Sequence, residues 1–61
     1  MNSRPELEYK LRNLEERLDD YKEFLEDALR ANDETMIKKW KNEILGLENE
    51  IQGIKDLLRG L

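Results

Sequence analysis

Paired carboxylates are the arrangement in this chain that comes closest to catalytic chemistry. Glu15 and Asp19, like Glu23 and Asp27, stand four residues apart and would share one face of a helix. Acid–base catalysis requires a carboxyl group that is shielded from water in a cleft. These residues fall outside the apolar stripes of the sequence, where they stay in water. We therefore interpret them as a solvated surface and not as catalytic pairs.

The rest of the usual catalytic repertoire is missing from the composition. The chain has no Cys and no His, which excludes disulfides, thiolate or imidazole metal ligands and the commonest general base. Its three glycines do not form a phosphate-binding loop. We expect no enzymatic activity, no metal and no cofactor.

A short basic segment carries an aromatic residue in its middle. Lys38, Lys39 and Lys41 surround Trp40, and such a mixture can hold phosphates and stack a nucleobase. Trp40 also belongs to an apolar stripe, which predicts that its ring is buried. Three lysines beside an acidic segment give little net positive field. A dimer would bring two such segments together, so a nucleic-acid site at these lysines stays an alternative.

Acidic residues crowd one surface of the first half of the chain. A solubilising surface is one interpretation, and a docking strip for a basic partner protein is the other. The net charge of −4, from 11 basic and 15 acidic residues, is modest for a mimic of nucleic acid. The candidate docking residues are Asp19, Asp20, Glu23, Glu26 and Asp27.

Two apolar heptad patterns must position all of these residues. Both have the a/d spacing that winds helices around each other, and neither alternates with the period of a strand. A chain with 43% charged residues also has the composition of long helices. The first pattern comprises Leu7, Leu11, Leu14, Leu18, Tyr21, Leu25 and Ala28, and the second comprises Ile37, Trp40, Ile44, Leu47, Ile51, Ile54, Leu58 and Leu61.

Local signals divide the chain into two helices, predicted at residues 4–31 and 34–59 with a turn at 32–34. Ser3 and Glu6 have the capping-box spacing, and Asn32 or Asp33 is the second N-cap. The second pattern is offset by five residues from the register of the first, so one continuous helix would carry two stripes that face different ways. The sequence therefore predicts a single all-α domain, residues 1–61, folded as an antiparallel two-helix hairpin.

The pairing of the two stripes can be predicted from the residue numbers. In a hairpin centred on the turn, facing residues have numbers that sum to 65, so that Leu7, for example, faces Leu58. All seven apolar residues of the first helix then face an apolar residue of the second. Each layer pairs an a with a d position, as in an antiparallel coiled coil.

A second packing surface is predicted on the second helix. Gly46 and Gly53 share one heptad position, and each costs about 1 kcal/mol relative to Ala inside a helix. Small residues at this spacing would let another backbone come close, although a tolerated, solvated face is also compatible with them. Apolar residues beside the stripe widen it, as in bundles of more than two helices. The candidate interface residues are Leu45, Gly46, Asn49, Gln52, Gly53, Phe24, Met36 and Leu57.

In length and layout, the predicted hairpin resembles the small plasmid-encoded Rop-type hairpins, which pair into four-helix bundles and bind RNA. The resemblance covers the layout alone and transfers no residue. A chain of 61 residues without disulfides or metals usually needs association for stability. We therefore predict a non-enzymatic interaction module that self-associates, most simply as a dimer, into a four-helix or larger bundle. A small regulatory, inhibitory or assembly protein would fit this description.

Two alternatives stay open at this stage. One is a Rop-like dimer that binds nucleic acid through Lys38–Lys41, and the other is a monomeric inhibitor that docks on one larger protein. No apolar run exceeds two residues, which predicts neither a membrane span nor a secretory signal. We expect a cytoplasmic protein whose partners are its own copies or a larger protein, with no membrane and no small-molecule substrate.

Overall fold

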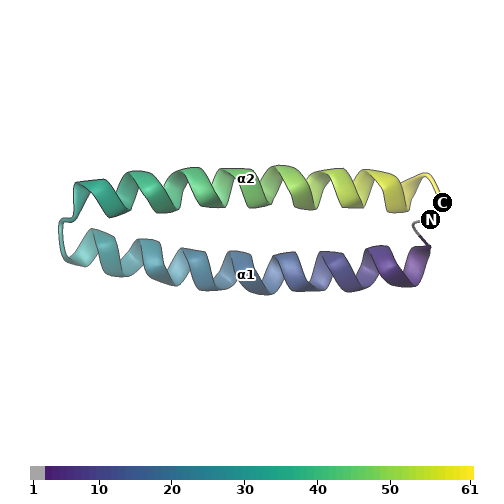
Figure 1. Ribbon diagram of the computed structural model, residues 1–61, viewed down its shortest axis with the longest axis horizontal. Helices are drawn as coiled ribbons and strands as arrows, with labels where there is room; N and C mark the ends of the chain where they lie inside the picture. Colours follow the sequence, from purple (N-terminus) through teal and green to yellow (C-terminus); the bar gives the residue numbers. More distant parts are fainter. Residues whose placement is uncertain (1–2) are drawn as a thin grey trace.

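The computed structural model describes residues 3–61, which form two α-helices joined by a tight turn. Helix α1 spans Arg4–Arg30 and helix α2 spans Glu34–Arg59. The helices lie side by side and antiparallel, with the start of α1 and the end of α2 at one end of the molecule and the turn at the other (Figure 1). The predicted hairpin is therefore confirmed. Met1 and Asn2, which belong to the predicted domain, lie outside the described residues.

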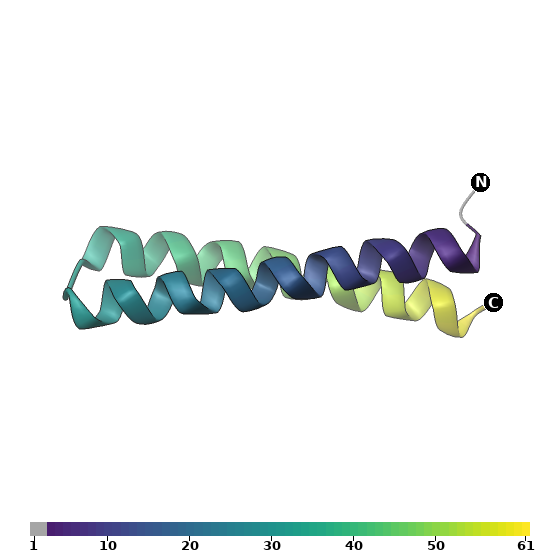
Figure 2. The same cartoon turned by 90° about the horizontal axis from the view of Figure 1, so that it is seen from below.

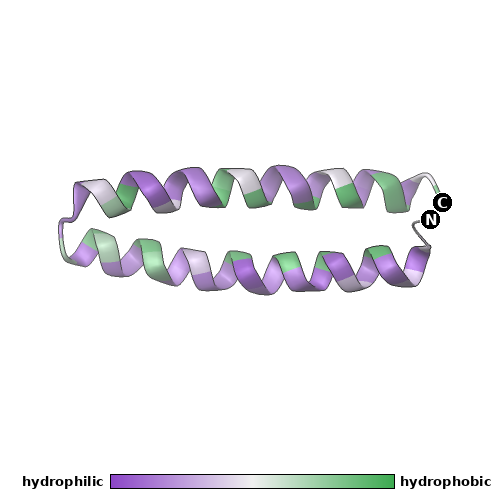
Figure 3. Ribbon diagram, viewed as in Figure 1, coloured by the Kyte–Doolittle hydropathy of each residue, from purple (hydrophilic) through white to green (hydrophobic). Residues whose placement is uncertain are grey.

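An apolar seam between the helices forms the core. The fourteen residues predicted to face each other are all buried or half-buried, and every other residue of the described range is exposed. Leu7, Ala28, Leu47 and Ile51 are the most buried. Figure 3 shows the hydrophobic bands of α1 and α2 turned mainly toward each other. The burial pattern thus confirms the predicted seam residues with one exception: Leu61, which lies beyond the end of α2, is exposed.

The turn reverses the chain through a Schellman motif. The Asp33 amide donates to the Ala28 carbonyl at 3.0 Å, and the Asn32 amide donates to the Leu29 carbonyl at 3.1 Å. Asn32 has a φ of 54°, in the left-handed region that Asn tolerates better than most residues. The Asp33 side chain then caps α2 by accepting from the Met36 amide at 3.2 Å. Of the two predicted N-caps, Asp33 is therefore correct, and Asn32 instead completes the end of α1.

The open end of the hairpin is held by the residues that begin α1. Ser3 Oγ accepts from the Glu6 amide at 3.4 Å, which confirms Ser3 as the first N-cap. Arg4 reaches across to the last turn of α2, where its guanidinium donates to the Leu58 carbonyl at 3.2 Å. A cation in this position also complements the dipole of α2. No pattern in the sequence predicts this contact, which ties the start of α1 to the end of α2.

The molecule is a thin rod, with Cα extents of 44 × 15 × 14 Å. Its helices cross at a shallow angle (Figure 2). The radius of gyration is 14.0 Å, whereas a compact domain of this length would have about 10.5 Å. The accessible surface is 4852 Å², against roughly 4200 Å² expected for a folded monomer of this mass. The hairpin by itself therefore leaves more surface in water than a chain of this size usually does.

Candidate interaction surface

One long side of the hairpin, formed by the heptad g positions of both helices, is grooved and partly apolar. In an antiparallel pair, the g residues of one helix lie beside the g residues of the other. Seven of the eight residues at these positions line three shallow grooves. We call this side the groove face; it comprises Lys10, Arg17, Phe24 and Ala31 of α1 and Met36, Glu43, Glu50 and Leu57 of α2.

The opposite side, formed by the heptad e positions, carries charges almost throughout. Its eight residues are all exposed, and Leu29 is the one apolar residue among them. We call this side the charged face; it comprises Glu8, Glu15, Lys22 and Leu29 of α1 and Glu34, Lys41, Glu48 and Lys55 of α2.

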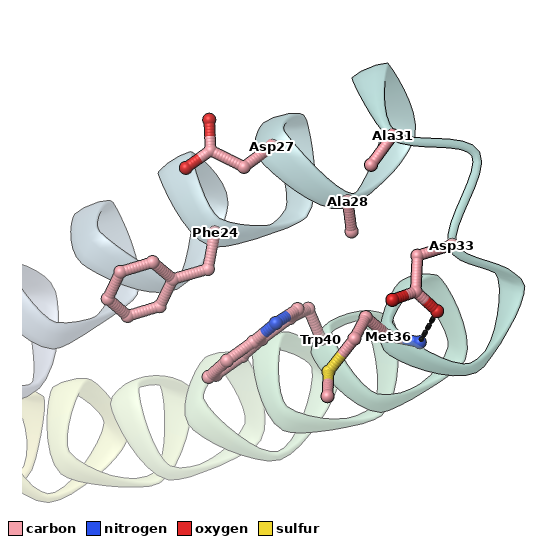
Figure 4. Close-up of a pocket in the computed structure, with 7 residues that line it drawn as sticks. All are labelled: Phe24, Asp27, Ala28, Ala31, Asp33, Met36 and Trp40. Atoms are coloured by element: carbon pink, nitrogen blue, oxygen red, sulfur yellow. Dashed lines mark hydrogen bonds between the residues drawn. The ribbon is translucent and has the colours of Figure 1, made fainter.

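The groove next to the turn is lined by aromatic and small side chains. The Phe24 and Trp40 ring centroids lie 4.9 Å apart, and the Tyr21 centroid lies 5.0 Å from that of Trp40. Figure 4 shows Phe24 opposite Trp40, with Met36 next to Trp40. Tilted rings attract each other at these distances, so the cluster stiffens this end of the rod. We call it the aromatic groove; it has a volume of about 320 Å³ and is lined by Phe24, Asp27, Ala28, Ala31, Asp33, Met36 and Trp40.

The aromatic groove is open to water although its walls are largely apolar. Phe24 is 43% exposed and Met36 is 40% exposed. Of the two carboxylates that line the groove, that of Asp27 pairs with Arg30 at 2.9 Å and that of Asp33 caps α2. The Asp27 carboxylate also points away from the rings (Figure 4). The groove therefore offers a partner apolar contact more than charge.

The middle of the groove face carries charges of both signs. Arg17 shares one groove with Glu43, Glu50 and Gly46, and a second groove with Lys10 and Glu50. Within residues 3–61, every ion pair shorter than 4.0 Å joins two residues of the same helix, and none involves these four charged side chains. Their charges can therefore pair with a partner without breaking an ion pair of the hairpin.

The middle of the outer surface of α2 is uncharged and contains two glycines that the hairpin itself does not need. In the part of the chain that the structure describes, a Cβ built at Gly46 or Gly53 meets no atom within 4 Å apart from the adjacent residues and the helix's own backbone. Leu45 is 59% exposed, and Asn49 and Gln52 are exposed beside it. Since Gly46 also lines a groove of the groove face, the predicted interface residues occupy two adjoining surfaces.

The candidate docking strip of acidic residues on α1 is exposed along its whole length. Two of its members are paired within the helix, since Glu26 lies 3.5 Å and Asp27 lies 2.9 Å from Arg30. Exposed pairs of this kind contribute little to stability. The strip therefore has the properties of a solvated surface, and its role in docking stays a prediction.

The lysine segment at the start of α2 differs from a typical base-stacking site. Lys38, Lys39 and Lys41 are exposed, and the Lys39 ammonium lies 4.9 Å from the centre of the Trp40 ring. The ring also packs against two aromatic neighbours, so much of it is already covered. The stripe position of Trp40 predicts a buried ring, but the residue is half-buried, because two helices cannot enclose so large a ring.

The aromatic cluster could have been found from the sequence. Tyr21 and Trp40 both belong to the seam, and Phe24 stands one turn from Tyr21. The residue numbers of Phe24 and Trp40 come close to the sum of 65 that marks facing residues, and those of Tyr21 and Trp40 differ from it by about one helical turn. Facing aliphatic residues touch only their own layer, whereas aromatic rings are large enough to reach the next one.

Residues 3–61 offer neither a metal site nor a membrane span in this structure. No group of three or more His, Cys, Asp or Glu side chains in this range could hold a metal ion. Neither described helix contains a stretch that is long and apolar enough to cross a lipid bilayer. Comparisons of the chain with protein-family models, with curated proteins and with solved structures find no match.

Proposed function

We propose that this chain is a non-enzymatic protein–protein interaction module that associates with its own copies, most simply as a dimer of hairpins in a four-helix bundle. A small regulatory, inhibitory or assembly protein is the setting that fits such a module. The observation that carries the proposal is the apolar surface that the hairpin leaves in water. Phe24, Met36, Leu45 and Leu57 are each between 40% and 59% exposed.

The small core supports association. Among residues 3–61, four side chains are buried and the other seam residues are half-buried. A rod of two helices has no further layer to cover the seam, and the chain has no Cys with which to form a disulfide instead. A second hairpin on the groove face would cover this side of the seam and turn half-buried residues into a core.

The glycines of α2 support a close approach between copies. Each glycine costs the helix about 1 kcal/mol relative to Ala. Nothing in the described hairpin occupies the space beside Gly46 or Gly53. Because glycine has no side chain, the backbone of a second copy can pack closer to α2 at these two positions. The additional contact would offset the cost of the glycines.

Two other proposals compete with self-association. Nucleic-acid binding through Lys38–Lys41 is disfavoured by the covered ring of Trp40, since that ring would have to stack a base. Docking of a monomer on one larger protein requires a hairpin that stays monomeric in solution. The solution mass therefore separates this second proposal from self-association.

Replacing both glycines by leucine tests the proposal through two opposite effects. Gly46→Leu with Gly53→Leu should raise the helix content of the hairpin, because Leu is a better helix former and a Cβ at either position has open space beside the helix. The same change should weaken self-association about tenfold or more, which corresponds to roughly 1.4 kcal/mol of lost contact. Circular dichroism measures the first effect and sedimentation equilibrium measures the second.

Glu8→Leu with Glu15→Leu is the matched control, since these residues also stand seven apart, on the charged face of α1. This control should leave the association constant unchanged. An association constant that the glycine variant also leaves unchanged would contradict an interface at α2.

A further inference from the structure

We propose that the two hairpins of the dimer pack through their groove faces with both turns at the same end, so that their aromatic grooves merge into one apolar core. This inference rests on the proposed function and specifies the partner of the groove face as a second copy in one orientation. A two-fold axis along the rod then places α1 of each copy opposite α2 of the other.

The apolar residues of the turn end match in this orientation. Facing residues share a height along the rod when their numbers sum to 65, within a copy and between copies. Phe24 of one copy therefore comes within one residue of the height of Trp40 of the second. Met36 comes within one residue of the height of Ala28 and within two of that of Ala31, whose small side chains leave room for it. Each copy thus supplies both a groove and the partly exposed side chains that fill the other groove.

The charges in the middle of the groove face match as well. With both turns at one end, Arg17 of one copy comes within two residues of the height of Glu50 of the second, or about 3 Å along the axis. Neither side chain makes an ion pair in the described hairpin. The two-fold axis repeats this contact, so the dimer gains two pairs of opposite charge.

The reverse orientation, with turns at opposite ends, brings like charges together. Such a dimer places α1 opposite α1 and α2 opposite α2, with the heights reversed. Arg17 then lies beside Arg17 of the second copy, and Glu43 comes within about two residues, roughly 3 Å, of the height of Glu50. Like charges that lie side by side across an interface repel each other, and this repulsion disfavours the reverse orientation.

The groove face is large enough for a specific dimer. The rod is 44 Å long and 15 Å wide. One side of this envelope covers roughly 660 Å² in projection. The accessible surface of that side is larger than its projection because it is corrugated. It is therefore comparable to the area of about 800 Å² that each partner buries in specific interfaces.

Distances between spin labels on the two copies test the orientation. The chain has no Cys, so Thr35→Cys at the turn end and Arg59→Cys at the open end each introduce one labelling position. Both residues are exposed, and neither belongs to the groove face. In the proposed dimer each variant should give a label-to-label distance of roughly 30 Å or less by double electron–electron resonance, because the two copies of α2 lie diagonally across a bundle whose neighbouring helices are about 10 Å apart.

Long label-to-label distances would contradict the proposed orientation. Distances of about 40 Å in both variants, close to the 44 Å length of the rod, would overturn the orientation while leaving self-association intact. A sample that has the mass of one chain and shows no distance between copies would overturn the proposed function together with this inference. Circular dichroism of the labelled variants ensures that each result comes from a folded hairpin.

Discussion

The groove face and the charged face border the same seam, yet they differ in what they present to water. Four of the eight residues of the groove face are apolar, namely Phe24, Ala31, Met36 and Leu57. One of the eight residues of the charged face is apolar, namely Leu29. The seam therefore explains the hairpin, and the difference between the two faces is the reason why we propose the groove face as the side that meets a second copy.

Burial would affect the two faces differently. Covering the charged face would remove Glu and Lys side chains from water, and a buried charge without a partner is costly. Covering the groove face would remove two half-exposed apolar side chains beside an aromatic cluster, and apolar burial is favourable by about 25 cal/mol per Å². The same hairpin thus has one side suited to solvent and one side suited to contact.

The largest expected effect comes from breaking the seam that both faces share. Ile51→Ala should lower the free energy of unfolding by about 2–5 kcal/mol, because Ile51 is only 7% exposed and its removal leaves a cavity. Urea denaturation followed by circular dichroism measures the change. Leu29→Ala on the charged face is the control and should stay within about 0.5 kcal/mol. Equal losses in both variants would mean that the seam is not the core.

A charge introduced on each face sharpens the comparison directly. Phe24→Glu with Met36→Glu should weaken self-association on the order of 100-fold, because central aromatic and apolar residues dominate interfaces. Leu29→Glu makes the same kind of change on the charged face and should alter the association constant less than about twofold. Sedimentation equilibrium gives both constants. A stronger effect from Leu29→Glu would assign the interface to the charged face instead.

A smaller effect is expected from the charges of the groove face. Arg17→Glu should weaken the dimer about tenfold at low salt, because it replaces an attraction to Glu50 of the second copy with a repulsion. Adding Glu50→Arg should restore the association constant. Lys22→Glu on the charged face should have little effect. If the double variant stays as weak as Arg17→Glu alone, Arg17 and Glu50 do not meet across the interface.

The smallest expected effect lies at the turn, away from both faces. Asn32→Ala should lower the free energy of unfolding by about 1 kcal/mol, because Asn32 has a φ of 54° and a Cβ without a polar group tolerates this region poorly. Asn32→Gly should preserve or slightly raise stability. Thermal unfolding measures both. An Asn32→Ala variant that is as stable as Asn32→Gly would argue against the left-handed turn.

The hairpin itself could be predicted because its cause is local and periodic. Fourteen seam residues follow one heptad repeat, which keeps them on the facing sides of the two helices, and the short turn limits how the two stripes can pair. Ser3 and Asp33 were likewise predictable as N-caps, because an N-cap depends on a side chain and the next three residues. The conformation of the turn was harder to predict. The turn has no Gly, so the left-handed position falls on Asn32. Asn is also a common N-cap residue, so its type alone does not distinguish these two roles.

The candidate surface could be predicted only in part. The glycines and the apolar residues beside the seam stand out in the sequence, and the structure shows that they are exposed. Contacts between neighbouring layers were less evident: those of Trp40 with Tyr21 and Phe24 follow from the seam positions only when ring size is considered, and that of Arg4 with Leu58 depends on a long side chain at the open end. Heptad patterns describe positions on a helix and not the reach of a side chain.

The solution mass across a dilution series tests the central claim most directly. Light scattering should give about twice the chain mass of 7.4 kDa, and helix content by circular dichroism should fall only where dilution separates the copies. A mass of one chain at every concentration, with the helix content unchanged, would contradict self-association. The proposal that a monomer docks on one larger protein would then replace self-association.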